Sequence, residues 1–262
     1  AEGYSFPSAH GTRTYTDLSD SGIIQKFSER GIDFCPCPIG REKMYPGCIQ
    51  TPGETQGPGC VVKVTTPQVV QEVREHFGCP HLQGAELENQ ATSLCSITNS
   101  HWEERIFMGE LMSSGQLTDY IYVSRVTLAL FEDSGWYLPD YTYADKLVKG
   151  VHWGFHLGCN FALHKCVDNG VTHFPRFWCT KSGSRKCSLT RTYEVTCSLK
   201  KAPDVGAPFK FFGESEALVG DNPEADYCPY YQHPVTSHAC TTPKSINAVR
   251  QNSLHEMFGP AS

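Results

Sequence analysis

The amino-acid sequence predicts an α+β chain that is mainly helical and irregular and ends in a disulfide-rich unit. Residues 65–78 and 120–134 carry the apolar periodicity of helices. Past residue 166 this pattern breaks into short pieces bounded by Cys, Pro and Gly. The chain has 262 residues, of which 39% are apolar, so it can form one large domain or two modest ones with a packed core.

Charge and hydropathy bear on the possible partners. The formal net charge is −6 and there is no dominant basic block, so a nucleic-acid partner is not expected. No apolar run approaches the roughly 18 residues that cross a bilayer. The chain begins with Ala and no signal-peptide pattern follows, so we expect either a mature product or a piece of something longer.

Thirteen cysteines are scattered along the chain, a pattern typical of disulfides formed in an oxidising compartment. Structural zinc is the alternative, but it favours C-x2-C pairs, which the sequence lacks. An extracellular or cell-surface location is therefore expected. The odd count leaves one Cys free or paired outside the chain. The cysteines are at 35, 37, 48, 60, 79, 95, 159, 166, 179, 187, 197, 228 and 240.

The first 62 residues are rich in Pro, Gly, Ser and Thr and predict an irregular segment, in which only 20–30 looks weakly helical. A firm helix follows at 66–78. Thr66 can cap it, Pro67 suits its first position and Gly78 suits a left-handed stop. Its apolar stripe is predicted to be core and consists of Val69, Val70, Val73 and Phe77.

A second apolar helix is predicted at 120–134 and a weaker third one at 160–166. Gly135 is the expected stop of the second helix. The apolar residues that share its face are Val123, Val126, Leu130 and Phe131.

The sequence lacks the helix on which zinc peptidases place two ligands and a general base, H-E-x-x-H. Only His255 is followed by Glu, and Gly259 stands where the second histidine belongs. His152 and His156 are four residues apart, but glycines interrupt the stretch and no carboxylate lies between them, so a shared metal is not favoured. On spacing alone, His101 is an isolated histidine.

Several blocks nevertheless match one family in order and spacing. They are VTTPQVVQEVREHFGCPHLQGAELENQ, SHWEERIFMGELM, SRVTLALFEDSGWYLPDYTYADKL, WG-x3-GC at 153–159 and DYCPYYQ at 226–232. Together they resemble the leishmanolysin family of zinc metalloproteases, a metzincin variant, and most of all its leishmanolysin-like (invadolysin) branch. The likeness runs from about Val64 to about Gln232.

The resemblance implies a zinc cofactor, with His101 as the third zinc ligand and Met112 as the methionine of the Met-turn beneath the metal. No catalytic residue is expected in this chain, because the general-base Glu belongs to the missing helix. The implied disulfides are Cys79–Cys159, Cys166–Cys228, Cys179–Cys197 and Cys187 with Cys240.

The resemblance also divides the chain. Residues 1–62 do not match the family. Residues 63–158 would be the lower, C-terminal half of a metzincin-type catalytic domain, and 159–262 a disulfide-rich unit. Without the upper half, the apolar stripes are expected to lose partners and pack poorly. The loop 91–100 departs from the family because it lacks Gly and carries Cys95.

The function implied is a zinc-dependent endopeptidase that acts on protein or peptide substrates, inactive in this chain alone because H-E-x-x-H is absent. Any membrane association would use a segment outside this chain. The alternative is a catalytically inactive adhesion or binding protein of the cell surface, which the altered loop 91–100 favours. A secreted disulfide-rich domain without specific chemistry is a third, weaker interpretation.

Overall fold

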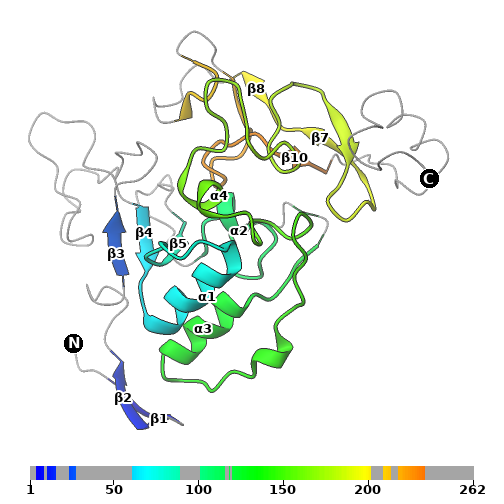
Figure 1. The fold of residues 1–262 in the computed structure, drawn as a ribbon. Coiled ribbons are helices and arrows are strands. Elements are labelled where there is room, and N and C mark those ends of the chain that lie inside the picture. The colour runs from blue at the N-terminus through cyan, green and yellow to red at the C-terminus, as the bar shows by residue number, and fades with distance from the viewer. Residues whose placement is uncertain are drawn as a thin grey trace, which may run out of the picture.

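The computed structural model of the chain describes residues 4–8, 11–15, 24–27, 61–88, 101–115, 118, 120–201, 209–213 and 218–233. Over these residues the fold mixes short helices with short strands (Figure 1). The loop 91–100 and the cysteines at 35, 37, 48, 60, 95 and 240 lie outside the described residues.

A small antiparallel sheet precedes and follows the first helix. β3 (Ile24–Phe27) pairs with β4 (Val61–Val64), and β4 pairs with β5 (Ala85–Leu87). The weak helix predicted at 20–30 is therefore wrong, because the strand pairing supplies its backbone with ladder partners that no local pattern reveals. Upstream, β1 (Tyr4–Ser8) and β2 (Gly11–Tyr15) pair with each other.

The helix predicted at 66–78 is confirmed as α1 (Pro67–Phe77). Gly78 ends it in the left-handed conformation, with φ 65°. Thr66 occupies the N-cap position as predicted, but its side chain makes no capping hydrogen bond. Instead, the Asp133 carboxylate accepts hydrogen bonds from the amides of Gln68 (2.9 Å) and Val69 (3.0 Å). A residue at the end of one helix thus caps the start of another.

The second predicted helix is present but begins later, as α3 (Arg125–Asp133). Ser124 is its cap, and the Ser124 hydroxyl accepts from the amide of Thr127 at 3.2 Å. The preceding residues are extended, because the amide and carbonyl of Tyr122 pair with Gly109 and Leu111. Apolar residues at 120–123 therefore belong to a strand-like segment that apolar periodicity could not separate from the helix.

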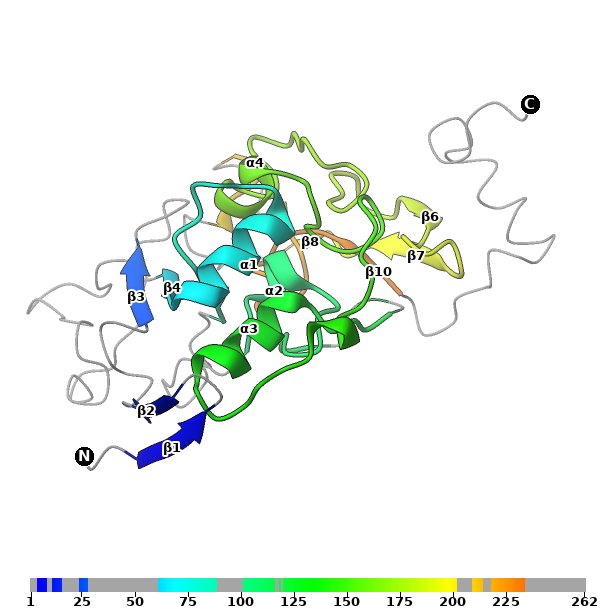
Figure 2. The same ribbon diagram turned by 60° about the horizontal axis from the view of Figure 1, so that its bottom comes forward.

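The apolar stripes of the two helices pack against each other, and Figures 1 and 2 show α1 and α3 side by side. The expectation that these stripes would lack partners is wrong. The side chains at the contact are at most 1% exposed and comprise Val69, Val73, Phe77, Val126 and Ala129. Phe131, expected on the same face, is instead 40% exposed.

The remaining elements are short. The helices are α2 (Glu104–Phe107), the 3-10 turn η1 (Tyr141–Tyr143) and α4 (Cys159–Leu163), the last of which overlaps the predicted 160–166 but begins one residue earlier and ends three residues earlier. A sheet is formed by β6 (Arg185–Cys187), β7 (Glu194–Cys197) and β10 (Tyr231–Gln232), and a smaller one by β8 (Lys200–Lys201) and β9 (Leu218–Val219). Strands of two to four residues are too short to show alternation, so the expectation of a mainly helical chain overlooked them.

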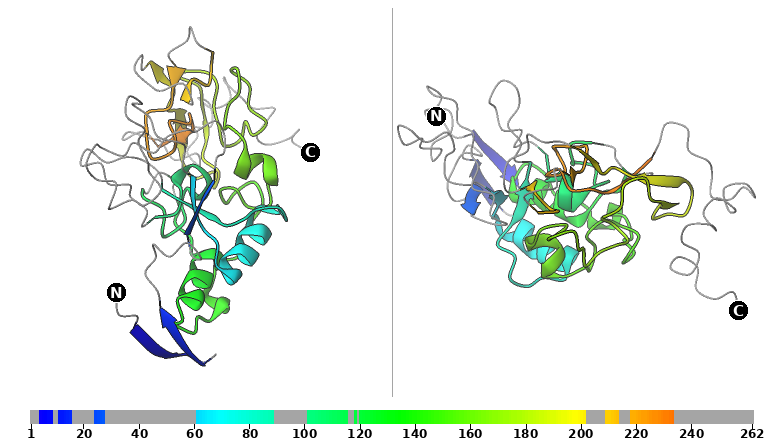
Figure 3. Two further views of the ribbon diagram at one scale, coloured as in Figure 1. Left: turned by 90° about the vertical axis from the view of Figure 1, so that its left-hand side faces the viewer. Right: turned by 90° about the horizontal axis from the view of Figure 1, so that it is seen from above.

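Three disulfides tie these pieces together, Cys79–Cys159, Cys166–Cys228 and Cys179–Cys197, the pairs that the resemblance implies. Cys187 is also disulfide-bonded, while its expected partner Cys240 lies outside the described residues. One apolar core runs from α1 and α3 through α4 to Tyr230, so the residues before and after 159 are packed as one body (Figure 3). Within the described part of the chain, no helix has the length and apolar character needed to cross a bilayer.

His76 is a buried base inside this core. It lies on α1 among Phe77, Phe107 and Tyr122, and its Nε2 is 3.3 Å from the carbonyl of Trp153. Burial lowers the pKa of His76 to about 4, a shift that the Trp153 carbonyl opposes and the nearby His156 and His152 reinforce. Folding therefore favours the neutral imidazole.

This pKa makes the free energy of unfolding depend on pH. At His76 the unfolded chain takes up a proton near pH 6.5, whereas the folded chain does so only near pH 4, so the contribution of His76 to stability falls as the pH drops through this window. The raised pKa values of the buried Glu88 and Glu104 act in the opposite direction. Between pH 7 and pH 5 the loss at His76 is about 2 kcal/mol. The His76→Gln variant keeps a hydrogen-bond donor for Trp153. In urea unfolding it should lack this loss of about 2 kcal/mol between pH 7 and pH 5, relative to the unaltered chain. His81→Gln, at an exposed position, is the control, and an unchanged slope in His76→Gln would contradict the prediction.

Candidate metal centre

His101 lies on an extended segment that adds to the sheet of β4 and β5. The amide of Glu88 donates to the carbonyl of His101 at 2.9 Å, and the amide of Glu103 donates to the carbonyl of Glu86 at 3.0 Å. Between these bonds, Leu87 and Trp102 form an antiparallel bridge and are both buried. The ladder thus fixes the position of His101 along the sheet.

Met112 is held beside this segment. The amide of Trp102 donates to the carbonyl of Met112 at 3.0 Å, and Trp102 forms a parallel bridge with Ser113. The Met112 side chain is partly buried against the main core. The structure therefore brings together the two segments that the resemblance pairs, with Met112 hydrogen-bonded to the residue that follows His101.

Glu110 fixes the turn that carries Met112. Its Oε2 accepts from the amide of Met112 at 2.6 Å. Its Oε1 accepts from the amide of Ser124 (3.0 Å), the Ser124 hydroxyl (2.8 Å) and the Thr127 hydroxyl (2.6 Å). Thr127 also accepts from the indole nitrogen of Trp102 at 2.8 Å. One buried carboxylate thus joins the turn, the start of α3 and the strand of His101, a role that sequence reasoning missed.

The His101 imidazole has the features of a ligand position. The residue is half-buried, and its Nδ1 is buried without a hydrogen-bond partner. A buried nitrogen without a hydrogen-bond partner is costly. Either a metal ion or a neighbouring side chain in another rotamer would supply that partner. Within the described ranges, the residues whose side chains gather as three possible ligands are Glu86, Glu103 and Asp226, without His101. Among the described residues, His101 is therefore not part of a gathered set of possible ligands.

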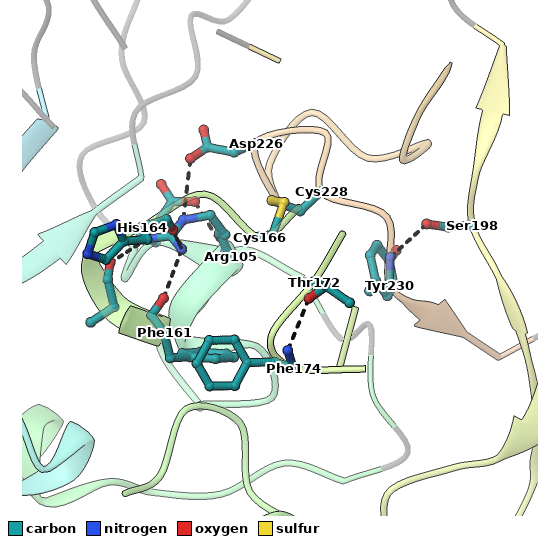
Figure 4. The surroundings of a disulfide bond; sticks show 12 residues. Arg105, Phe161, His164, Cys166, Thr172, Phe174, Ser198, Asp226, Cys228 and Tyr230 are labelled. Carbon is teal, nitrogen blue, oxygen red and sulfur yellow. Dashed lines mark hydrogen bonds and ion pairs between the residues drawn. A yellow bond between two sulfur atoms is a disulfide. The ribbon is translucent and has the colours of Figure 1, made fainter. Parts of the chain in front are cut away.

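The group of Glu86, Glu103 and Asp226 already has a cation. Arg105 is buried, its guanidinium lying 3.9 Å from the Glu86 carboxylate and 3.6 Å from that of Asp226. Figure 4 shows this guanidinium between Asp226 and the end of α4, close to the Cys166–Cys228 disulfide. A paired buried guanidinium explains the carboxylates without a metal.

Two further buried carboxyls lie between the His101 strand and the Met112 turn. Burial raises the pKa of Glu88 to about 9 and that of Glu104 to about 7, against hydrogen bonds that lower both. The amide of Glu104 is 3.4 Å from Oε2 of Glu88, and the amide of Gly115 donates to Oε2 of Glu104 at 3.1 Å. Neither carboxyl was singled out from the sequence, although the alternation in E-L-E at 86–88 places Glu86 and Glu88 on one face.

The other histidine pair has separate partners. His152 accepts from the amide of Val148 at 2.8 Å through Nδ1, and Nε2 of His156 is 3.7 Å from the Glu75 carboxylate. Each ring is thus explained by its own neighbours.

The model of a metallopeptidase family, described as leishmanolysin, matches residues 54–262. The match covers most of the chain, which therefore belongs to the leishmanolysin family. The leishmanolysin-like peptidase of Caenorhabditis elegans is 36% identical over 195 residues, 64% of this chain and 28% of the relative. The leishmanolysin-like peptidase of Drosophila melanogaster is 36% identical over 189 residues, which are 64% of this chain and 26% of the relative.

A leishmanolysin homolog of Crithidia fasciculata is 33% identical over 183 residues, 68% of this chain and 26% of the relative. The chain matches little more than a quarter of the length of these relatives. The likeness to the animal leishmanolysin-like branch that the sequence blocks predicted is confirmed.

Replacing the Glu110 carboxylate should loosen the Met112 turn. In Glu110→Gln an amide group faces donors that need an acceptor, so we expect the free energy of unfolding to fall by about 3 kcal/mol. Hydrogen exchange of the Met112 amide should accelerate as well. Glu75→Gln, whose side chain is 77% exposed, is the matched control and should change stability by less than about 0.5 kcal/mol. Equal effects of the two substitutions in urea unfolding would contradict the role assigned to Glu110.

Proposed function

We propose that this chain is the part of a leishmanolysin-type zinc endopeptidase that supplies the third zinc ligand, His101, and the Met-turn methionine, Met112. One observation carries the proposal. The Nδ1 atom of His101 is buried without a partner, and the next residue, Trp102, donates a backbone hydrogen bond to Met112. The peptidase names of the relatives support this function over an inactive adhesion protein.

A catalytic zinc site needs about three protein ligands and one open position, and a single imidazole cannot hold the ion. Bound there, zinc would supply Lewis-acid polarisation of the peptide carbonyl and activation of water. In this proposal His101 provides one ligand, and the general base and the other ligands come from an H-E-x-x-H helix outside the 262 residues. The chain alone is then inactive.

The residues of this chain position and shield the ligand. Trp102 anchors the strand of His101 in the core, and Glu110 holds the Met112 turn against α3. The polarizable thioether of Met112 would pack under the metal-bound histidines. The proposed division, within one packed body, is a lower catalytic part at 63–158 and a disulfide-rich unit at 159–262. The segment 1–62 precedes them, and the family match includes only its end, from residue 54.

The proposed substrates are proteins or peptides, and the proposed location is outside the cell or on its surface. The disulfides support this location, because they persist in oxidising compartments. Any attachment to a membrane would use a segment outside this chain.

The transcript upstream of Ala1 tests the proposal directly. We expect an open reading frame that continues upstream and encodes a helix with H-E-x-x-H. A signal peptide immediately before Ala1 would overturn the proposal, because the remaining ligands would then have no source in the same chain.

Zinc content is the second test. The longer product that carries H-E-x-x-H should bind one zinc ion and cleave peptides, and chelation should abolish both properties. His101→Ala should remove stoichiometric zinc and reduce peptidase activity below detection, because a ligand is lost. His81→Ala, at an exposed position, should retain both. Full zinc occupancy in His101→Ala, measured by atomic absorption, would contradict the assignment.

A further inference from the structure

Glu88 and His101 lie directly opposite each other in the ladder. The bridge between Leu87 and Trp102 is antiparallel, so the next pair along is Glu88 with His101, and the amide of Glu88 bonds the carbonyl of His101. Opposed residues of an antiparallel pair share one face, with Cβ atoms about 5 Å apart. Because Leu87 and Trp102 face the core, Glu88 and His101 share the opposite face.

Each of these two side chains has one buried atom without a partner. They are Oε1 of Glu88 and Nδ1 of His101. The Glu88 side chain is fully buried, so solvent does not replace the missing hydrogen bond. An imidazole nitrogen that carries its proton donates, and a carboxyl keeps an accepting oxygen even when its other oxygen is protonated. A single hydrogen bond between the two would satisfy both atoms.

Most of the other polar atoms nearby are already engaged. Oε2 of Glu88 accepts from the amide of Glu104, and Oε2 of Glu104 accepts from the amide of Gly115. Glu86 lies on the same face of β5, but it faces the guanidinium of Arg105. Oε1 of Glu104 is also buried without a partner, but Glu104 belongs to α2. Oε1 of Glu88 is therefore the unpartnered acceptor that the ladder places opposite His101.

We propose that Glu88 is a positioning residue for His101, its Oε1 accepting a hydrogen bond from Nδ1–H and thereby fixing the tautomer and orientation of the ring. This leaves the second ring nitrogen unprotonated and available to a metal ion. The inference rests on the proposed function for the role of that nitrogen, but the Glu88–His101 pair itself does not depend on a metal. Histidine ligands of metals commonly donate their other N–H to such a carboxylate.

The pair is tested on the 262-residue chain without metal. Nitrogen-15 labelling of histidine and long-range nitrogen–proton correlation spectra report which ring nitrogen carries the proton. The His101 signals are assigned by their loss in His101→Gln. In the unaltered chain the Nδ1–H tautomer of His101 should dominate by about tenfold or more, the ratio that about 1.4 kcal/mol produces.

Two substitutions at position 88 separate the pair from a general structural effect. Glu88→Met fills the same space without an acceptor and should abolish the preference for Nδ1–H. Glu88→Gln keeps a carbonyl oxygen and should retain part of the preference for Nδ1–H. This second variant keeps the proposal testable if Glu88→Met does not fold. Glu104→Gln removes a neighbouring carboxylate that does not oppose His101 and should leave the tautomer ratio unchanged. An unchanged ratio in Glu88→Met, or a Glu88→Gln variant that behaves like it, would overturn the proposal.

Zinc affinity distinguishes this inference from the proposed function. In the longer product, zinc should bind roughly 10- to 100-fold more weakly in Glu88→Met. If zinc binding requires His101 but is unaffected in Glu88→Met, the positioning role fails and the proposed function stands. If the tautomer depends on Glu88 but the product binds no zinc, the pair stands and the proposed function fails.

Discussion

The buried guanidinium of Arg105 is the interaction on which the arrangement of this chain depends. Arg105 lies on α2, four residues after His101, and donates to three carbonyls at the end of α4, those of Phe161 (3.2 Å), Ala162 (2.7 Å) and His164 (3.4 Å). A buried cation is tolerated only when its hydrogen bonds and charge are matched. Arg105 therefore locks the His101 segment to the residues that follow 159, and the Cys166–Cys228 disulfide closes the same junction (Figure 4).

The sheet beside Arg105 has an apolar face and a buried polar face. Leu87 and Trp102 fill the core on one side. On the other side, the ladder places Glu86 opposite Glu103 and Lys63 opposite Glu86, all buried. Apolar side chains would stabilise such a face more simply, since burying carboxyls carries a desolvation cost. Opposite charges on the same face offset this cost, because Lys63 lies opposite Glu86 in the ladder and the Arg105 guanidinium lies 3.9 Å from the Glu86 carboxylate.

Sequence patterns predicted the parts of this structure that depend on local chemistry. Pro67 and Gly78 set the ends of α1 because their backbone preferences act within one turn. The start of α3 could not be predicted, because Ser124 is fixed by Glu110 from another segment. The proximity of His101 and Met112 followed from resemblance of whole sequence blocks, whereas Arg105 and Glu88 act through partners distant in sequence and leave no local signal.

These long-range pairs mean that the position of His101 is set before any metal binds. Its strand is bonded to β5 on one side and to the Met112 turn on the other, and α2 continues from it into the Arg105 cluster. A ligand held by a sheet and a packed turn loses little conformational entropy on coordination, so less of the binding free energy is spent on ordering it. In the proposed site, the ordering cost would then fall mainly on the ligands of the H-E-x-x-H helix and on forming the hydrogen bond proposed between His101 and Glu88.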